Sequence, residues 1–134
     1  MKKNFLMVLF LMMALMASAQ DLVVCSYNIR NSNRGDDKNG NGWKTRYEYL
    51  CQQIEFEDPG LFGCQEVKKE QLDDMIARMP EYAYVGVGRD DGKEGGEYSP
   101  VFYKKDRYVL LESGTFWLAE DPTKPVLGWD AACK

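Results

Sequence analysis

Short apolar runs and stripes of apolar residues at helical spacing follow one another along the chain. The run Leu22–Ile29 shows little alternation, which is typical of a strand covered on both faces. A polar loop is expected over Asn31–Gly42, and a helix then runs to the turn at Asp58-Pro59-Gly60, because apolar positions fall on one of its faces. Those positions are Trp43, Tyr47, Leu50, Cys51 and Ile54.

The second part of the chain predicts more strands than helices. Leu61–Gln65 reads as a second buried strand, and a second helix extends from about Lys68 to Met79, where Pro80 closes it. The further strands expected are Tyr82–Val87, Val101–Tyr103, Tyr108–Leu111 and the short Thr115–Leu118, with a hairpin turn at Lys104-Lys105-Asp106. The order β-α-β-α-β-β-β favours an α+β fold built as a layered sheet.

Residues 1–20 predict a secretory signal peptide. Lys2 and Lys3 form a basic start, Phe5–Ala17 is an apolar run, and Ala17-Ser18-Ala19 supplies a small-residue cleavage site. The run is too short for a transmembrane helix. We therefore expect a soluble protein that is exported to the periplasm or the extracellular space, with residues 21–134 as its folded part.

The net charge restricts the classes of binding partner, and the spacing of the cysteines restricts the kinds of metal or redox site. The net charge of −4 becomes more negative once Lys2 and Lys3 leave with the signal, which argues against broad electrostatic binding to nucleic acid. None of the four cysteines forms a CxxC motif, so a zinc or thioredoxin-type site is excluded. We expect free thiols, with Cys25 and Cys64 inside strands, because a domain of this length does not need disulfides.

Two polar side chains directly follow the first two strands and are the candidate metal ligands. Asn28 ends the first apolar run and Glu66 follows the second. Either residue alone is typical of an ordinary strand end or helix start. Neighbouring strands would bring both side chains to one edge of the sheet, where a carboxylate is costly unless it is paired or metal-bound. Amide and carboxylate oxygens suit a hard cation such as Mg²⁺, so this pair predicts a metal site.

Three other sequence patterns allow a functional interpretation, and each can also be explained by structure alone. The stretch Asp37–Glu48 fits the calcium-loop pattern letter for letter, but a strand rather than a helix enters it, which favours an exposed connecting loop. Arg89 and the Gly-rich run after it could cradle a phosphate, or could form a flexible loop between strands. Trp43, Trp117 and Trp129 could form a sugar or base platform, although packing is the simpler interpretation.

Taken in order, the motifs resemble the endonuclease/exonuclease/phosphatase superfamily, in particular its exported bacterial members. They are SYNIR, GW with Arg46, CQEV, GRDDGKEGGEYSPVFY, GTFWL and GWDAAC, and they span Leu22–Lys134. The resemblance implies a four-layer α/β sandwich that hydrolyses phosphate esters of a type left open here, using Mg²⁺ or Mn²⁺. It implies that Asn28 and Glu66 bind the metal and that Arg89 lies at the phosphate rim.

The resemblance also implies that part of the family's site is absent. The later histidine and aspartate motifs do not occur, and the chain contains no histidine. We therefore expect residues 21–134 to form the N-terminal half of such a domain, a mixed sheet with two helices on one side and an exposed apolar inner face. We expect little or no turnover from it and assign no catalytic residue. Glu97, Tyr98 and Asp130 match motif positions and receive no role.

The alternative hypothesis is an exported, non-catalytic module that binds calcium or glycans. It would use the Asp37–Glu48 loop and the tryptophans, and tight Ca²⁺ binding lost in Asp37→Ala would favour it. A third possibility is a product that folds poorly and has no function. The substrate and the oligomeric state stay open, since one fold serves many functions.

Overall fold

A computed structural model of the chain describes residues 21–129 and 131, and it contains one mixed sheet of four strands in the order β1-β2-β4-β3. β1 (Val24–Asn28) is parallel to β2 (Leu61–Gln65). β4 (Val101–Lys104) is antiparallel to β2 on one side and to β3 (Tyr82–Val85) on the other. The α+β class and the mixed sheet predicted from the sequence are therefore confirmed.

Part of the sequence-based interpretation lies outside the described residues. The expected signal peptide covers residues 1–20, and Asp130 and Cys133 belong to the end of the chain that the structure does not describe. Within the part that it does describe, no helix combines the length and the apolar character needed to cross a bilayer.

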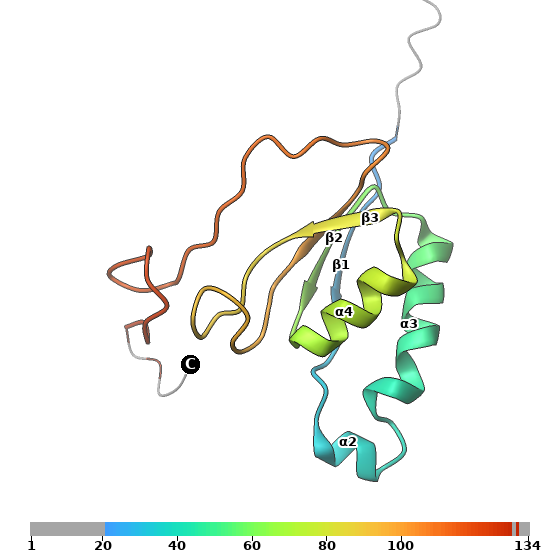
Figure 1. Cartoon of the computed structure of the whole chain (residues 1–134), viewed down its shortest axis with the longest axis horizontal. Coiled ribbons are helices and arrows are strands. Elements are labelled where there is room, and N and C mark those ends of the chain that lie inside the picture. Colours follow the sequence, from blue (N-terminus) through green and yellow to red (C-terminus); the bar gives the residue numbers. More distant parts are fainter. Residues whose placement is uncertain (1–20, 130, 132–134) are drawn as a thin grey trace, which may run out of the picture.

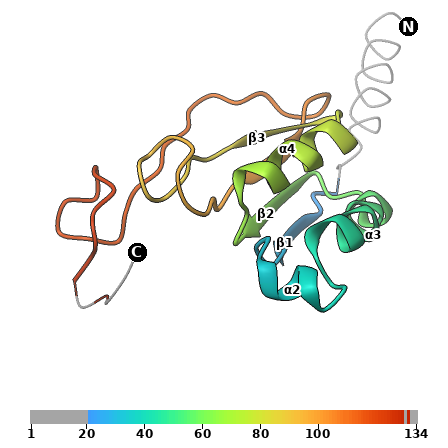
Figure 2. The same cartoon turned by 60° about the horizontal axis from the view of Figure 1, so that its bottom comes forward.

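Two long helices cover one face of the sheet (Figures 1 and 2). α3 (Trp43–Glu57) and α4 (Lys69–Arg78) contact each other and share one core with the sheet. The central side chains of that core are Leu50, Cys51 and Ile54 of α3, Leu72 and Met75 of α4, and Phe62, Cys64, Tyr82 and Phe102 of the sheet. The prediction of two helices on one side is confirmed.

The opposite face of the sheet carries no helix and is open among the described residues. Alternation places Val24, Leu61, Val85 and Val101 on this face, through the register pairs that join neighbouring strands. Val24 is 62% exposed and Val101 is 44% exposed. The exposed apolar face that the resemblance implied is thus present. After β4 the chain runs away from the sheet, as Figures 1 and 2 show.

Three expectations about strands are wrong. β1 is mostly exposed instead of covered on both faces, because it is an edge strand that pairs only with β2. Tyr108–Leu111 is not a strand, because β4 is already paired along both edges and a hairpin partner has no edge to join. Thr115–Leu118 likewise has no strand structure.

Two boundaries also differ from the prediction. The loop Asn31–Gly42 contains a short helix, α2 (Arg34–Lys38), which begins where the Asn33 side chain accepts a hydrogen bond from Asp36 N. The third strand ends at Val85 rather than Val87. Gly86 has a φ of 132°, and a Cβ atom there would lie 3.1 Å from Pro100 Cα, so the chain leaves the strand at this glycine.

The cysteines within the described residues are free thiols, as predicted for Cys25, Cys51 and Cys64. Burial raises the pKa of Cys51 to about 11 and that of Cys64 to about 12. These two thiols are therefore protonated core residues rather than nucleophiles.

Candidate metal and phosphate site

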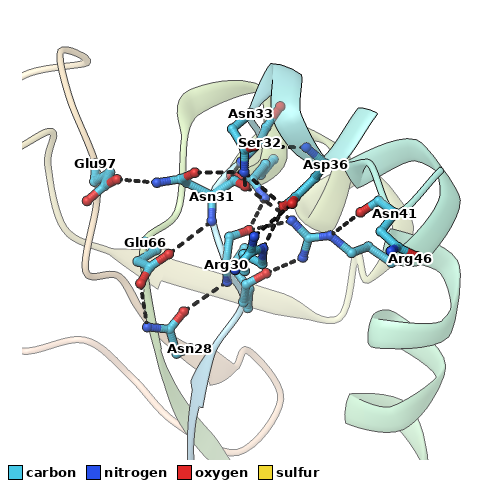
Figure 3. Close-up of polar contacts among 12 residues, drawn as sticks. Asn28, Arg30, Asn31, Ser32, Asn33, Asp36, Asn41, Arg46, Glu66 and Glu97 are labelled. Atoms are coloured by element: carbon cyan, nitrogen blue, oxygen red, sulfur yellow. Dashed lines mark hydrogen bonds and ion pairs between the residues drawn. The ribbon is translucent and has the colours of Figure 1, made fainter. Parts of the chain in front are cut away.

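The ends of β1 and β2 bring Asn28 and Glu66 together at one edge of the sheet. The two strands are parallel, with Asn28 opposite Gln65, so Asn28, the last residue of β1, and Glu66, the first residue after β2, lie at the carboxyl ends of neighbouring strands. Asn28 Nδ2 donates a hydrogen bond to Glu66 Oε1 at 2.9 Å (Figure 3). The prediction that the two side chains meet at one edge of the sheet is confirmed, and their role as metal ligands stays a prediction.

Backbone strain marks Glu66 itself and the turn that follows Asn28. Arg30 and Glu66 have φ angles of 57° and 62°, a left-handed conformation that residues other than glycine rarely adopt. Asn28 Oδ1 accepts from Arg30 N at 2.9 Å, and Glu66 Oε2 accepts from Asn31 N at 3.2 Å. The side chains of the pair thus stabilise the strained turn, and the turn in turn fixes their positions.

Gln71 of α4, which sequence reasoning did not single out, ties together the turns that follow β1 and β2. It is fully buried. Its Oε1 accepts from Ser32 N at 2.9 Å and from Lys68 N at 3.1 Å. Its Nε2 donates to Arg30 O at 3.1 Å. The one available signal was its place at the third position of a helix, where glutamine often bonds back to the start.

Arg46 of α3 holds the turn after β1 from the other side. Its guanidinium donates to Ile29 O, to Arg30 O at 2.6 Å and to Asn31 O at 3.2 Å. It also lies 5.5 Å from the centre of the Trp43 ring, within the range of a cation–π contact. The sequence placed Arg46 in a motif without a role, and the structure makes it a clamp on backbone carbonyl groups.

An ion pair completes the support of this turn. Arg30 Nε donates to Asp36 Oδ2 at 2.5 Å and Arg30 Nη2 donates to Asp36 Oδ1 at 2.7 Å. This bidentate hydrogen bond from Arg30 lowers the pKa of Asp36 to about 2. Asp36 belongs to α2, so the unpredicted helix has a part in shaping the candidate site.

The loop between β3 and β4 contributes Arg89 and Glu97. Asn31 Nδ2 donates to Glu97 Oε1 at 2.7 Å, and Arg89 Nη1 lies 2.8 Å from Glu97 Oε2. A chain of contacts therefore runs from Arg89 through Glu97 and Asn31 to Glu66. Arg89 and Glu66 also line the same cavity, of about 500 Å³. Arg89 is thus near the predicted metal ligands, and Glu97 gains a bridging position that the sequence left unassigned.

The electrostatics of Glu66 fit a hard divalent cation. Hydrogen bonds from Asn28 Nδ2 and Asn31 N hold the pKa of Glu66 below its ordinary value, so the carboxylate is ionised at neutral pH. The ionised carboxylate of Glu66 and the amide oxygen of Asn28, which accepts from Arg30 N, are ligand types that suit Mg²⁺ or Mn²⁺. Among the described residues no group of three or more His, Cys, Asp or Glu side chains could hold a metal. Asn28 and Glu66 would therefore supply part of a coordination sphere.

The calcium-loop pattern does not gather its residues around one point. Asp37 lies in α2, and Glu48 lies on α3, where its Oε2 is 3.3 Å from Arg78 Nε.

The tryptophans are also separate in their contacts. Trp43 is 2% exposed and its Nε1 donates to Asp74 Oδ2, so it packs in the core as the simpler interpretation predicted.

Comparison with known proteins gives the following relatives, and no family model matches the chain. An endonuclease/exonuclease/phosphatase family protein of Bacteroides thetaiotaomicron is 48% identical over 83% of this chain and 41% of its own, with a TM-score of 0.81. A mannosyl-6-phosphatase of the same species is 47% identical over 84% of this chain and 42% of its own, with a TM-score of 0.82. Protein R895 of Acanthamoeba polyphaga mimivirus, which is uncharacterized, is 29% identical over 103 residues, 15% of its length.

The chain thus spans about two fifths of the length of the two bacterial structures it matches, 41% and 42%. The matched part includes most of the described residues. In sequence and in fold, the chain is a partial relative of the endonuclease/exonuclease/phosphatase family proteins.

Proposed function

We propose that this chain carries part of the metal site of a phosphoesterase, in which Asn28 and Glu66 bind Mg²⁺ or Mn²⁺. The observation that carries the proposal is their contact at 2.9 Å, at the ends of two parallel strands and beside a strained turn. The 47% identity to a mannosyl-6-phosphatase supports a phosphate ester as substrate, with a phosphorylated sugar as the first candidate.

Each residue has a separate task in this proposal. Glu66 supplies a negatively charged oxygen. Asn28 Oδ1 supplies a neutral one, since it has a second lone pair beyond the one that accepts from Arg30 N. A cation held there would stabilise charge on the phosphoryl and leaving-group oxygens. Arg89, which lines the same cavity, would bind phosphate oxygens through its guanidinium.

We also propose little or no turnover by residues 21–134 alone. The chain has no histidine, the usual general acid or base near pH 7. Export remains part of the proposal as well, because residues 1–20 have the composition of a signal peptide.

Mn²⁺ binding to the 134-residue chain, followed by the EPR signal of the free ion, tests the metal site. We expect saturable binding that weakens by about tenfold or more in Glu66→Ala, comparable to the loss of a group that supports a bound metal. Glu112→Ala, an exposed carboxylate outside the site, is the matched control and should bind like the parent chain. Equal affinity in all three proteins would contradict the proposal.

Turnover is tested separately with a generic phosphodiester and Mg²⁺ or Mn²⁺. We expect no hydrolysis above the rate without protein. Hydrolysis that disappears in Glu66→Ala would show that the described residues are sufficient for catalysis, and would make the expectation of an inactive chain wrong.

A further inference from the structure

The cavity that contains Glu66 has two chemically different sides. It measures about 500 Å³ and lies between the loop that joins β3 to β4 and the segment 115–118. The charged side chains at it are Glu66, Arg89 and Glu97, and the apolar ones at its other side are Phe116, Trp117 and Leu118. Binding a metal and a phosphate uses only the charged side, so the proposed function leaves the apolar side without a task.

A hydrogen bond of Trp117 connects the apolar side of the cavity to the backbone of its charged side. Its Nε1 donates to Arg89 O at 2.8 Å. The ring lies against Gly92, since a Cβ atom there would be in ordinary van der Waals contact with Trp117 Cη2, at 3.4 Å. Trp117 N also donates to Pro122 O at 2.9 Å, which closes the segment on itself. The apolar side is therefore fixed to Arg89, the same residue whose guanidinium is proposed to bind phosphate.

The neighbours of Trp117 offer large apolar surfaces at the cavity. Phe116 is 72% exposed and Leu118 is 69% exposed. An aromatic and an aliphatic side chain beside a few polar groups are the usual composition of a small-molecule site. Covering such surface removes it from water, which is favourable, so a ligand that reaches it gains affinity.

We propose that Phe116, Trp117 and Leu118 bind the alcohol part of the substrate, and that the preferred phosphate esters carry a ring with an apolar face. A pyranose ring and an aryl ring share this chemistry, since both can stack on an aromatic side chain. The inference rests on the proposed function, because it places the phosphate at Glu66 and Arg89. An acyclic ester such as glycerol 3-phosphate would leave the apolar side uncovered.

Binding of four phosphate compounds to the 134-residue chain, measured by calorimetry with saturating Mn²⁺, tests the inference. The compounds are inorganic phosphate, glycerol 3-phosphate, glucose 6-phosphate and phenyl phosphate. We expect at least one ring ester to bind about tenfold more tightly than glycerol 3-phosphate, a difference of about 1.4 kcal/mol. Preference for glucose 6-phosphate alone would identify a sugar site, and preference for phenyl phosphate alone an aryl site.

Phe116→Ser should abolish the preference for ring esters and leave the affinity for inorganic phosphate unchanged. Because Phe116 is exposed, this substitution leaves the core intact. Leu111→Ser is the matched control, since Leu111 is 94% exposed and does not line the cavity. It should keep the full preference.

The outcomes separate this inference from the proposed function. Equal affinity for ring and acyclic esters, or a preference that survives Phe116→Ser, would overturn the inference and leave the metal and phosphate site intact. No detectable binding of any phosphate compound would also overturn it. If, in addition, Mn²⁺ binding were insensitive to Glu66→Ala, the proposed function would fail together with it.

Discussion

At the scale of single residues, the turn after β1 depends on a carboxylate whose ionisation is set by Arg30. The hydrogen bond from Arg30 holds the pKa of Asp36 at about 2, compared with the ordinary value of 3.8. The ionised form is therefore favoured in the folded state. The pair stabilises the fold above the ordinary pKa, and this contribution is lost as the pH falls from 3.8 toward about 2.

We predict that Asp36→Asn lowers the urea midpoint of unfolding at neutral pH, and that the difference from the parent chain shrinks in acid. The measurement is urea denaturation followed by circular dichroism at pH about 7, above the titration, and at pH about 2.5, where most of the contribution is lost. Asp37→Asn, an exposed neighbour in the same helix, should change the midpoint little at either pH. A difference for Asp36→Asn that is independent of pH would show that ionisation of Asp36 is not the cause.

At the scale of elements, α4 connects the core to the candidate site through Gln71. The residue is buried, as are Leu72 and Met75 of the same helix, and its amide bonds to the turns that follow β1 and β2. Losing that amide leaves Ser32 N and Lys68 N without this acceptor.

We predict that Gln71→Leu destabilises the chain by about 1–3 kcal/mol, the usual cost of leaving buried polar groups unpaired. Urea denaturation at neutral pH measures the free energy of unfolding. Gln52→Leu, the same change at an exposed position of α3, is the control and should stay within about 0.5 kcal/mol of the parent. A similar small effect for both variants would mean that Gln71 does not hold the turns.

What could be predicted from sequence at this scale was mostly local. Periodicity and the turn Asp58-Pro59-Gly60 predict the two long helices and the strands that end at Asn28 and Gln65. The placement of Asn28 beside Glu66 follows once these two strands are taken as neighbours. The missing hairpin after β4 could not be predicted, because it depends on β4 pairing with both β2 and β3, which are distant in sequence.

The supporting residues of the site were missed for a related reason. Arg46 and Gln71 bind backbone groups that the left-handed conformation of Arg30 turns toward them, and a sequence does not display that conformation. The helix α2 was missed because it depends on the ion pair of Asp36 with Arg30, which fixes a polar segment that resembles a loop. Asn28 and Glu66 were found because each directly follows an apolar run.

At the scale of the whole molecule, the described residues leave one sheet face and one strand edge uncovered. Val24 lies on both, since it belongs to the edge strand β1 and is 62% exposed. β1 contains no charged residue and no proline, the features that commonly keep edge strands from pairing with other molecules.

We predict that the 134-residue chain self-associates as its concentration rises, because covering the open face and edge is favourable. Sedimentation velocity over a series of concentrations measures this. Val24→Lys should increase the monomer fraction at each concentration, whereas Leu111→Lys, an exposed change away from the sheet, should not. A chain that is monomeric throughout the series would contradict the prediction.

The clamp formed by Arg46 has a consequence for the order in which ligands bind. Its guanidinium is committed to the carbonyl oxygens of the turn after β1, and Arg89 is paired with Glu97. The pair of Arg89 with Glu97 leaves the cavity with the negative charge of Glu66, which repels a phosphate that approaches before a cation is bound. A divalent cation at Glu66 reverses the sign of that field, so we expect compulsory order, with the cation first and the phosphate ester second.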